Sequence, residues 1–152
     1  MSRIQLALNV DDVEAATAFY ATLFGLEPAK VRPGYANFAV ADPPLKLVLL
    51  ERPGQGGTLN HLGVEMDSVD AVDALQARLA AHGLASVDER GTTCCYATQD
   101  KFWVEGTPGG ERWEVYAVLA DSETFFGQPD GPACCAAGEA STDPATAAAA
   151  CC

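Results

Sequence analysis

Two stretches of the chain share one order of hydrophobic and polar positions. The stretch "IQLALNVDDVEAA" at positions 4–16 aligns without gaps with "NHLGVEMDSVDAV" at positions 60–72, an offset of 56 residues. Self-similarity at a fixed offset is typical of a duplicated structural module. The matched apolar pairs are Leu6 with Leu62, Leu8 with Val64, Val10 with Met66, Val13 with Val69, and Ala15 with Ala71.

Each copy opens with alternating apolar residues, which predicts a strand with one buried face, and continues with a helical pattern. In the first copy Asp11 and Glu14 have the spacing of a capping box, and Gly25 ends the helix. In the second copy Gly83 provides the stop. The predicted buried stripes are Val13, Ala16, Tyr20, Leu23 and Phe24 in the first helix, and Val69, Val72, Leu75 and Leu79 in the second.

Short strand candidates follow each helix, separated by the turn signals "ADPP", "TQDK" and "GTPGGER". The pattern predicts an α+β fold of two strand-helix-strand-strand-strand (βαβββ) modules, at about 1–55 and 58–120. We expect them to form one curved mixed sheet with outer helices and a cleft on the concave face. The strand candidates are 35–40 and 46–50 in the first module, and 86–89, 95–98, 102–105 and 113–118 in the second.

The last part of the chain, 121–152, has a different composition. Its stretch "GQPDGPACCAAGEASTDPATAAAACC" is rich in Ala, Gly, Pro and Ser, and no Lys or Arg follows Arg112. Such a composition buries too little apolar surface to offset the entropy of ordering. We expect a disordered tail after a folded region at 1–120.

Length and charge limit the possible functions. A chain of 152 residues suits one compact domain, and its net charge of -12 argues against binding to nucleic acid or an anionic membrane. No apolar run approaches 18 residues, and Met1 to Asp11 lacks the pattern of a signal peptide. We therefore expect a cytoplasmic protein that takes a small neutral or electrophilic ligand.

All six cysteines stand in adjacent pairs: Cys94-Cys95, Cys134-Cys135 and Cys151-Cys152. A disulfide between neighbours in sequence needs a strained peptide, and zinc-finger spacing is absent. Paired soft thiolates suit a thiophilic centre such as trivalent arsenic, cadmium or copper(I). The alternative interpretation is that these cysteines are small apolar core residues.

Three residues are candidate metal ligands. Gln5 and His61 occupy equivalent positions in the two copies, so both side chains are expected to reach one cleft. Glu114 lies in "RWEVY", where strand alternation places its carboxylate opposite the apolar Trp113 and Val115. An imidazole, an amide oxygen and a carboxylate leave open positions and suit iron(II), manganese or nickel better than structural zinc.

Each candidate ligand also has an interpretation that involves no metal. His61 can be a hydrogen-bonded core histidine, and Gln5 an exposed strand residue, whereas an inward Glu114 still needs a partner. His82 lies in the last turn of the second predicted helix, where a histidine suits the helix dipole. We assign no chemistry to His82.

The paired modules, with ligands at the start of each and on the last strand, resemble the vicinal oxygen chelate superfamily over about 1–120. That superfamily includes glyoxalase I, extradiol dioxygenases and the fosfomycin and bleomycin resistance proteins. The stretches "NHLGVEM" and "TTCCYATQDKFWVEGTPGGERWEVY", with the cysteine-rich tail, closely resemble the carbon-arsenic lyases and the related cadmium-induced proteins.

This resemblance implies an Fe(II)- and dioxygen-dependent enzyme that cleaves the carbon-arsenic bond of trivalent organoarsenicals. Methylarsenite would give arsenite and formaldehyde. Gln5, His61 and Glu114 match the metal positions, and Cys94 and Cys95 match the substrate-binding pair. Nickel, cobalt or manganese can replace iron in a purified sample. The usual first ligand in the superfamily is histidine, so Gln5 departs from that pattern.

The adjacent cysteines Cys94 and Cys95 also predict the local backbone structure. Neighbouring residues in a strand point to opposite faces, so two converging thiols predict a loop or an irregular strand start at Cys94-Cys95. A mobile loop would capture substrate when open and deliver it on closing. Tyr96, Lys101 and Trp103 are close enough in sequence to line the pocket, although packing is the usual role of strand aromatics. The tail cysteines are equally compatible with arsenical scavenging and with no role.

Two rival functions remain at this stage. A thiol-based protein could bind cadmium or arsenic without turnover. A glyoxalase-like isomerase would need a second carboxylate as base, for which Glu51 is the candidate, although its neighbours "ERPGQGG" indicate a loop. The sequence leaves the preferred arsenical, the metal and the oligomeric state open.

Overall fold

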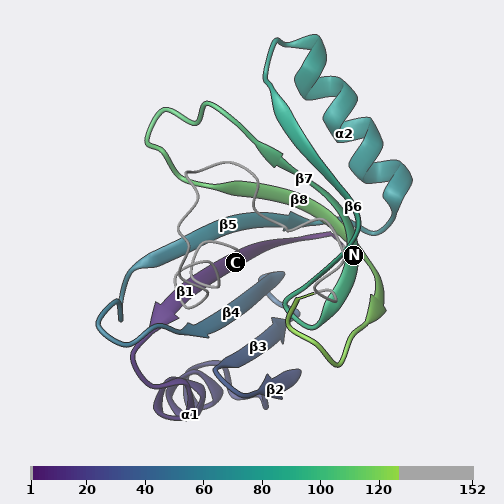
Figure 1. The fold of residues 1–152 in the computed structure, drawn as a ribbon. Helices are drawn as coiled ribbons and strands as arrows, with labels where there is room; N and C mark the ends of the chain where they lie inside the picture. Colours follow the sequence, from purple (N-terminus) through teal and green to yellow (C-terminus); the bar gives the residue numbers. More distant parts are fainter. Residues whose placement is uncertain (1, 127–152) are drawn as a thin grey trace. The chain divides into compact units, whose positions relative to one another are not determined.

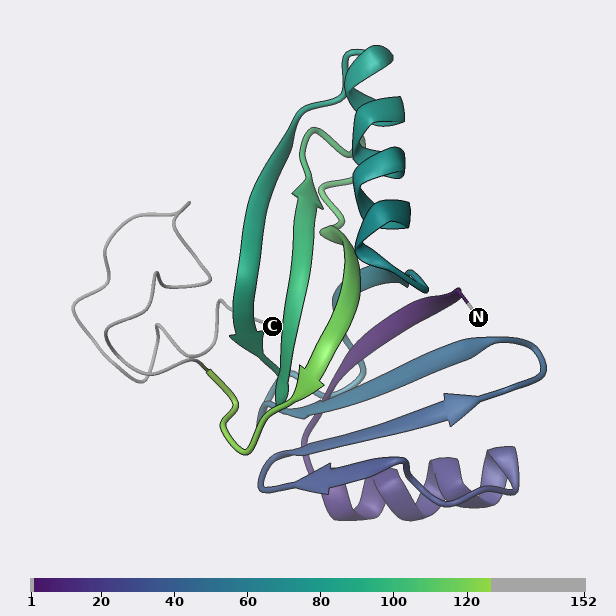
Figure 2. The same cartoon turned by 90° about the vertical axis from the view of Figure 1, so that its right-hand side faces the viewer.

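The computed structural model describes residues 2–126 (Figures 1 and 2). It contains ten elements, with a strand and a helix at the start of each sequence repeat. In chain order they are β1 (Arg3–Val10), α1 (Val13–Phe24), β2 (Lys30–Arg32), β3 (Tyr35–Val40), β4 (Leu45–Glu51), β5 (Leu59–Glu65), α2 (Val69–Ala81), β6 (Ser86–Cys94), β7 (Ala97–Val104) and β8 (Trp113–Asp121).

The contacts divide the chain into two compact units. The first comprises 1–65 and 106–114, and the second comprises 66–105 and 115–152, of which the structure describes 115–126. Neighbouring strands follow the order β2-β3-β4-β1-β5 in the first unit and β8-β7-β6 in the second, and β8 begins in the first unit. Within the first unit, β1 runs parallel to β4 and antiparallel to β5.

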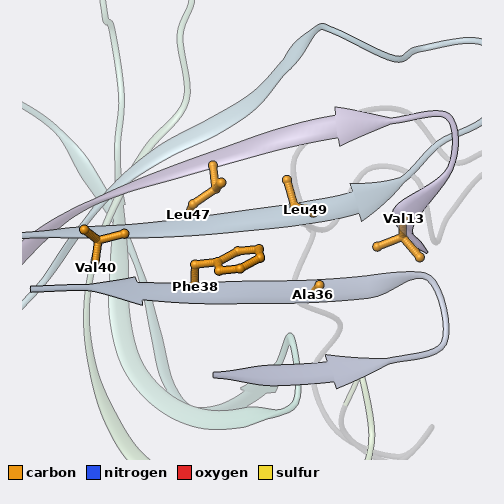
Figure 3. Packing of buried hydrophobic residues seen from close by; sticks show 6 residues of the cluster. All are labelled: Val13, Ala36, Phe38, Val40, Leu47 and Leu49. Carbon is orange, nitrogen blue, oxygen red and sulfur yellow. The ribbon is translucent and has the colours of Figure 1, made fainter. Parts of the chain in front are cut away.

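The core of the first unit lies between α1 and one face of its strands (Figure 3). Phe38 on β3 and Leu47 and Leu49 on β4 are almost fully buried there, together with Val13 from the start of α1. Tyr20 and other apolar side chains of α1 pack against them. Because strand side chains alternate, the other face of β1, β3 and β4 carries the remaining set. That set includes Gln5, Ala7, Asn9, Tyr35, Asn37, Lys46, Val48 and Leu50.

The second unit is a sheet with α2 along one side (Figure 2). Gln76 of α2 donates hydrogen bonds to Ser86 Oγ (3.0 Å) and Asp88 Oδ1 (2.9 Å), which places these β6 residues on the helix side. Glu89 pairs with Lys101 in the β6-β7 ladder and therefore lies on the opposite face. The residues of β7 on that face are Ala97, Gln99, Lys101 and Trp103.

A two-residue turn joins β6 to β7. Cys94 pairs with Ala97 across it, and the two residues between, Cys95 and Tyr96, have φ angles of 55° and 62°. Positive φ at both central positions defines the type I′ turn, which ordinarily contains Asn and Gly because other side chains are strained there. The cysteine turn, residues 94–97, is thus a strained hairpin turn.

The predicted α+β class with two related modules is confirmed, and both predicted helices are present. Strand β3 has the predicted bounds, and β4 extends the prediction by one residue at each end. The buried stripe predicted for α2 is also confirmed, since Val72 is fully buried and its neighbours on the stripe are partly buried. The tail was expected at 121–152. Of these residues the structure describes 121–126, in which Asp121 ends β8 and Ser122 and Phe125 form backbone hydrogen bonds with the turn between β6 and β7, and 127–152 lie outside the described residues.

Two expectations about α1 were wrong. The N-cap is Asp12, whose side chain accepts from the Ala15 N–H at 2.9 Å, and not Asp11. The Asp11 carboxylate instead accepts from the backbone of the 53–57 loop. Leu23 is exposed because it lies at the edge of the helical stripe, beyond the reach of the strands.

The strand predictions for 86–105 need a correction too. "TQDK" is not a turn but lies within β7, and β6 runs on to Cys94, so the two candidates 95–98 and 102–105 are one strand. Polarity suggested a turn, yet Gln99 and Lys101 are both buried. The short edge strand β2 is the third strand that the βαβββ pattern requires in the first module, although its position was not predicted. The cysteine pair lies where β6 ends, in part as expected, since Cys95 is in the turn.

The strained turn gives a stability prediction. Cys95→Gly should raise the free energy of unfolding by roughly 0.5 to 1 kcal/mol, because relief of the left-handed strain outweighs the added chain entropy. Cys95 is only half-buried, so little packing is lost. Urea unfolding under reducing conditions measures the change.

Cys94→Gly is the matched control, because Cys94 is buried in β6 and has no positive φ. This variant should be less stable than the parent. A Cys95→Gly variant that is no more stable than the parent would contradict a strained turn.

Candidate functional site

Gln5, His61 and Glu114 come together in the first unit. Gln5 lies on β1, His61 on β5 and Glu114 on β8, and all three side chains are at most 5 % exposed. The amide nitrogen of Gln5, Nε2, is 2.9 Å from His61 Nε2 and 2.7 Å from Glu114 Oε1, and the last two atoms are 3.3 Å apart. The sequence-predicted set is therefore one buried polar cluster.

The pairing of β1 with β5 explains this meeting. The two strands are antiparallel, with Gln5 opposite Gly63 and Ala7 opposite His61. Residues at equivalent positions of the repeat are thus related by a local twofold axis between the strands. Glu114 follows Arg112, whose carbonyl accepts from the Leu62 N–H at 2.8 Å, so the start of β8 lies beside β5.

The small residues opposite Gln5 and His61 make room for the cluster. A Cβ atom built on Gly63 would lie 3.2 Å from both Gln5 Cβ and Glu114 Cγ, and 3.3 Å from Gln5 Nε2. These approaches are tighter than ordinary side-chain contacts. Glycine at 63 therefore lets the amide and the carboxylate approach each other. The sequence analysis missed this residue, although the repeat aligns it with the small Ala7.

The donor set fits a divalent cation. The lone pairs of His61 Nε2 and Glu114 Oε1 converge on the Gln5 NH₂ group, the most positive part of the amide. Rotation of that amide about its terminal bond presents Oε1 instead, giving nitrogen and oxygen donors around one point. Among residues 2–126 no three His, Cys, Asp or Glu side chains gather to hold a metal, so the amide of Gln5 is needed to complete a set of three.

Other carboxylates near the cluster have different roles. Glu65, two residues from Gly63, bonds Arg3 at 2.7 Å and Lys46 at 2.8 Å. Glu51 accepts from the Val13 N–H at 3.0 Å at the start of α1. Glu51 also pairs with Val10, so it lies on the α1 face of the sheet and away from the Gln5 face. This position disfavours Glu51 as the base of a glyoxalase-like isomerase.

The second unit carries the thiol pair. Sγ of Cys94 lies 3.2 Å from Sγ of Cys95, beyond the roughly 2.05 Å of a disulfide, so neither cysteine is in a disulfide. The left-handed turn is what brings neighbouring side chains to one side. Gln99 donates from Nε2 to the Cys94 carbonyl at 3.2 Å, and its own Oε1 is buried without a hydrogen-bond partner.

The segment 122–126 is bonded to this turn. The Cys95 N–H donates to the Phe125 carbonyl at 2.8 Å, and the Ser122 N–H donates to the Tyr96 carbonyl at 3.0 Å. Tyr96 packs edge-on against Phe125 with ring centroids 5.4 Å apart, which fits the packing role expected of it. These contacts hold the turn in its strained conformation.

Lys101 is the unexpected residue of this unit. It is 1 % exposed, and its ammonium lies 3.4 Å from Glu89 Oε2 and 4.9 Å from the centroid of the Trp103 ring. A buried lysine requires such partners. By strand alternation Lys101 shares a face of β7 with Gln99 and Ala97, the partner of Cys94. The polar residues "TQDK" were the only local sign of buried polar groups here, and they were interpreted as a turn.

The remaining candidates are less informative. His82 caps the end of α2, where its Nδ1 lies 2.8 Å from the Arg78 carbonyl, in agreement with a role in the helix end. Cys134, Cys135, Cys151 and Cys152 lie outside the described residues. In the described part of the chain, no helix is both long and apolar enough to cross a membrane.

Several known proteins are similar to this chain in sequence or in fold. The trivalent organoarsenical cleaving enzyme of Thermomonospora curvata is 54 % identical over 153 aligned positions, covering 100 % of both chains. The cadmium-induced protein CadI of Mycobacterium tuberculosis is 71 % identical over 129 residues, 85 % of this chain and 84 % of that protein. Among solved structures, the 2,3-dioxygenase LapB of Pseudomonas sp. KL28 superposes with a TM-score of 0.58 at 20 % identity, over 79 % of this chain and 42 % of LapB.

The LapB likeness shows the fold alone, whereas the two sequence relatives show common descent. A family model for the Glyoxalase/Bleomycin resistance protein/Dioxygenase superfamily matches residues 3–115, which include β1, β5 and the start of β8. The duplicated modules, the pairing of their first strands and these matches agree. The chain belongs to the Glyoxalase/Bleomycin resistance protein/Dioxygenase superfamily.

Proposed function

We propose that this protein is an Fe(II)-dependent dioxygenase that cleaves the carbon-arsenic bond of trivalent organoarsenicals. For methylarsenite the reaction is CH₃As(OH)₂ + O₂ → As(OH)₃ + HCHO, in which atoms balance. The methyl carbon gives up four electrons, which reduce one dioxygen, so no further reductant is needed. The proposed setting is the cytoplasm, where thiols stay reduced.

The observation that carries this proposal is the geometry of the thiol pair. The sulfur atoms of Cys94 and Cys95 are 3.2 Å apart. An atom bonded to both at about 2.3 Å, the length of a zinc-thiolate bond, would have a sulfur–atom–sulfur angle of roughly 90°. Tetrahedral zinc prefers a wider angle. Trivalent arsenic is pyramidal and forms narrow angles, so the pair suits arsenic better than zinc.

Capture of the substrate is a double exchange at arsenic. Each thiol forms an As–S bond as an As–OH bond breaks, and the hydroxyl leaves as water with the thiol proton. The methyl group then stays on arsenic, held by two covalent bonds. The unpartnered Gln99 Oε1, on the Cys94 face of the hairpin, offers an acceptor for an arsenic hydroxyl after the first exchange. Reversal of both exchanges by water releases arsenite.

The first unit supplies the metal set. Gln5 through Oε1, His61 through Nε2 and Glu114 through Oε1 would hold the ion, in a mixed nitrogen and oxygen set like those of non-heme iron oxygenases. When bound, Fe(II) supplies the activation of dioxygen for oxidation of the carbon. Burial of the three side chains keeps bulk water from them. That the metal set and the thiol pair serve one reaction is part of the proposal.

A sequestering protein is the second candidate. The 71 % identical relative is a cadmium-induced protein, and a thiol pair without turnover would suit such a role. That function needs Cys94 and Cys95 but neither Glu114 nor dioxygen. The two candidates therefore differ in what the metal ligands do.

An activity experiment separates them. Protein loaded anaerobically with Fe(II) receives methylarsenite and then oxygen, while arsenite and formaldehyde are measured. Equal amounts of both products are expected, with at least a 100-fold loss of rate in His61→Ala, Glu114→Ala and Cys95→Ser, since each removes a ligand of iron or arsenic. The four tail cysteines are replaced by serine, so that arsenic binding reports Cys94 and Cys95.

The chain offers a matched control in its second histidine. His82→Ala should retain the parent rate, because His82 bonds only within the end of α2 in the described structure. Tight methylarsenite binding with no product, in protein shown to contain iron, would overturn the enzyme and leave the sequestering protein.

Substitution of Gly63 tests the metal set without turnover. Gly63→Ala should weaken Mn(II) binding by about 10- to 100-fold, the range seen when the surroundings of metal ligands are altered. The added Cβ forces Gln5 and Glu114 apart from their present approach. Electron paramagnetic resonance of free Mn(II) measures the affinity, and manganese avoids binding by thiols because it prefers oxygen and nitrogen donors.

Circular dichroism and thermal unfolding of the metal-free variant show whether Gly63→Ala leaves the fold intact. Mn(II) affinity equal to that of the parent, in a folded variant, would argue that Gln5 and Glu114 do not share an ion.

A further inference from the structure

A line of hydrogen bonds runs from His61 away from the metal set. His61 Nδ1 is 2.7 Å from Asn60 Oδ1, and Asn60 Nδ2 donates to Asn9 Oδ1 at 2.9 Å. Asn9 Nδ2 donates to Thr58 Oγ1 at 2.9 Å, and that hydroxyl donates to the Gln55 carbonyl at 2.7 Å. We propose that this Asn60-Asn9-Thr58 relay fixes the tautomer of His61, and that Asn60 and Asn9 are positioning residues of the metal set.

The direction of the relay is set at its far end. A backbone carbonyl only accepts, so the Thr58 hydroxyl must give its proton to Gln55 and can take only a donor from Asn9. Asn9 must then turn its oxygen toward the Asn60 amide nitrogen. Asn60 in turn presents its oxygen to His61 Nδ1, and an amide oxygen only accepts. Nδ1 therefore carries the proton.

The backbone holds the relay in place. The Asn9 N–H donates to the Thr58 carbonyl at 2.9 Å, and the Gly57 N–H donates to the Asn9 carbonyl at 3.0 Å. Asn9 is only 5 % exposed, so its hydrogen bonds operate at low local dielectric and meet little competition from water. The two backbone bonds keep Thr58 beside Asn9.

The relay opposes a competing state. Glu114 Oε1 lies 3.3 Å from His61 Nε2, and a carboxylate at that distance favours a proton on Nε2. That tautomer would remove the Nε2 lone pair and leave the Nδ1 lone pair facing Asn60 Oδ1. Asn60 would then have to turn its amide over, and Asn9 after it, so the Thr58 hydroxyl would have to donate to Asn9 and would lose its hydrogen bond to the Gln55 carbonyl.

The relay residues Asn60 and Asn9 have no counterparts in the other half of the repeat. The repeat aligns Asn60 with Ile4 and Asn9 with Glu65. Ile4 is 45 % exposed, and Glu65 forms ion pairs with Arg3 and Lys46. An equivalent relay is thus absent behind Gln5 in the described structure. An amide has no tautomer to fix, whereas an imidazole does, so the relay accompanies the ligand that needs it.

The tautomer can be read directly in metal-free protein. The chain has two histidines, so ¹⁵N-histidine labelling gives two sets of ring signals, which long-range ¹H-¹⁵N spectra assign at a pH of about 8. His61 should show a protonated Nδ1 in the parent. Asn60→Leu should move the proton to Nε2, and Asn60→Asp should keep it on Nδ1 because it retains an acceptor.

His82 serves as the internal control, with unchanged signals showing that Asn60→Leu is folded. Asn9→Leu should act in the same direction as Asn60→Leu, because it frees Asn60 to turn its amide. A folded Asn60→Leu variant that keeps the proton on Nδ1 would overturn the relay. A merely structural role for Asn60 would lower stability without moving the proton.

The consequence for metal binding rests on the proposed function and is measured separately. Mn(II) affinity should fall about 10- to 100-fold in Asn60→Leu and stay near that of the parent in Asn60→Asp. If the proton moves as expected while the parent binds no Mn(II), the relay stands and the metal function fails. If the parent binds Mn(II) and Asn60→Leu binds it equally, the positioning role is overturned.

Discussion

The antiparallel pairing of β1 with β5 is the constraint from which the proposed metal set follows. It joins the first strands of the two repeats about a local twofold axis, so equivalent positions 5 and 61 lie on the same face of neighbouring strands. The same register places a small residue opposite each ligand, Gly63 opposite Gln5 and Ala7 opposite His61. A slip of one strand by one residue would place Gln5 and His61 on opposite faces of the sheet.

The buried polar side chains of the candidate metal site are hydrogen-bonded to one another. Gln5, His61 and Glu114 are almost inaccessible to water, yet each has partners within the cluster. Unpaired, such groups would destabilise the fold by several kcal/mol. The thiol turn differs, because its cost is conformational: two left-handed residues are held by contacts from 122–126. Strain of this kind concentrates at functional sites.

The sequence predicted those features that leave a local pattern. Alternation and the repeat at 4–16 and 60–72 indicated both modules and brought Gln5 and His61 into register, and Glu114 was identified from strand alternation. It could not predict features that depend on distant partners. "TQDK" resembled a turn because nothing local shows that Gln99 and Lys101 are buried, and the relay joins Asn9 to Asn60 across 51 positions.

Glycine at 63 also determines how this scaffold can be redesigned. Any residue that replaces Gly63 adds a side chain, and even a methyl group there would crowd Gln5 and Glu114. Random mutagenesis at 63 is therefore expected to return variants in which the proposed metal set is disturbed. Position 5 is the reverse case, because the strand opposite it contributes no Cβ and leaves space for other donor groups. A library that seeks a new metal preference should diversify position 5 and keep position 63 fixed.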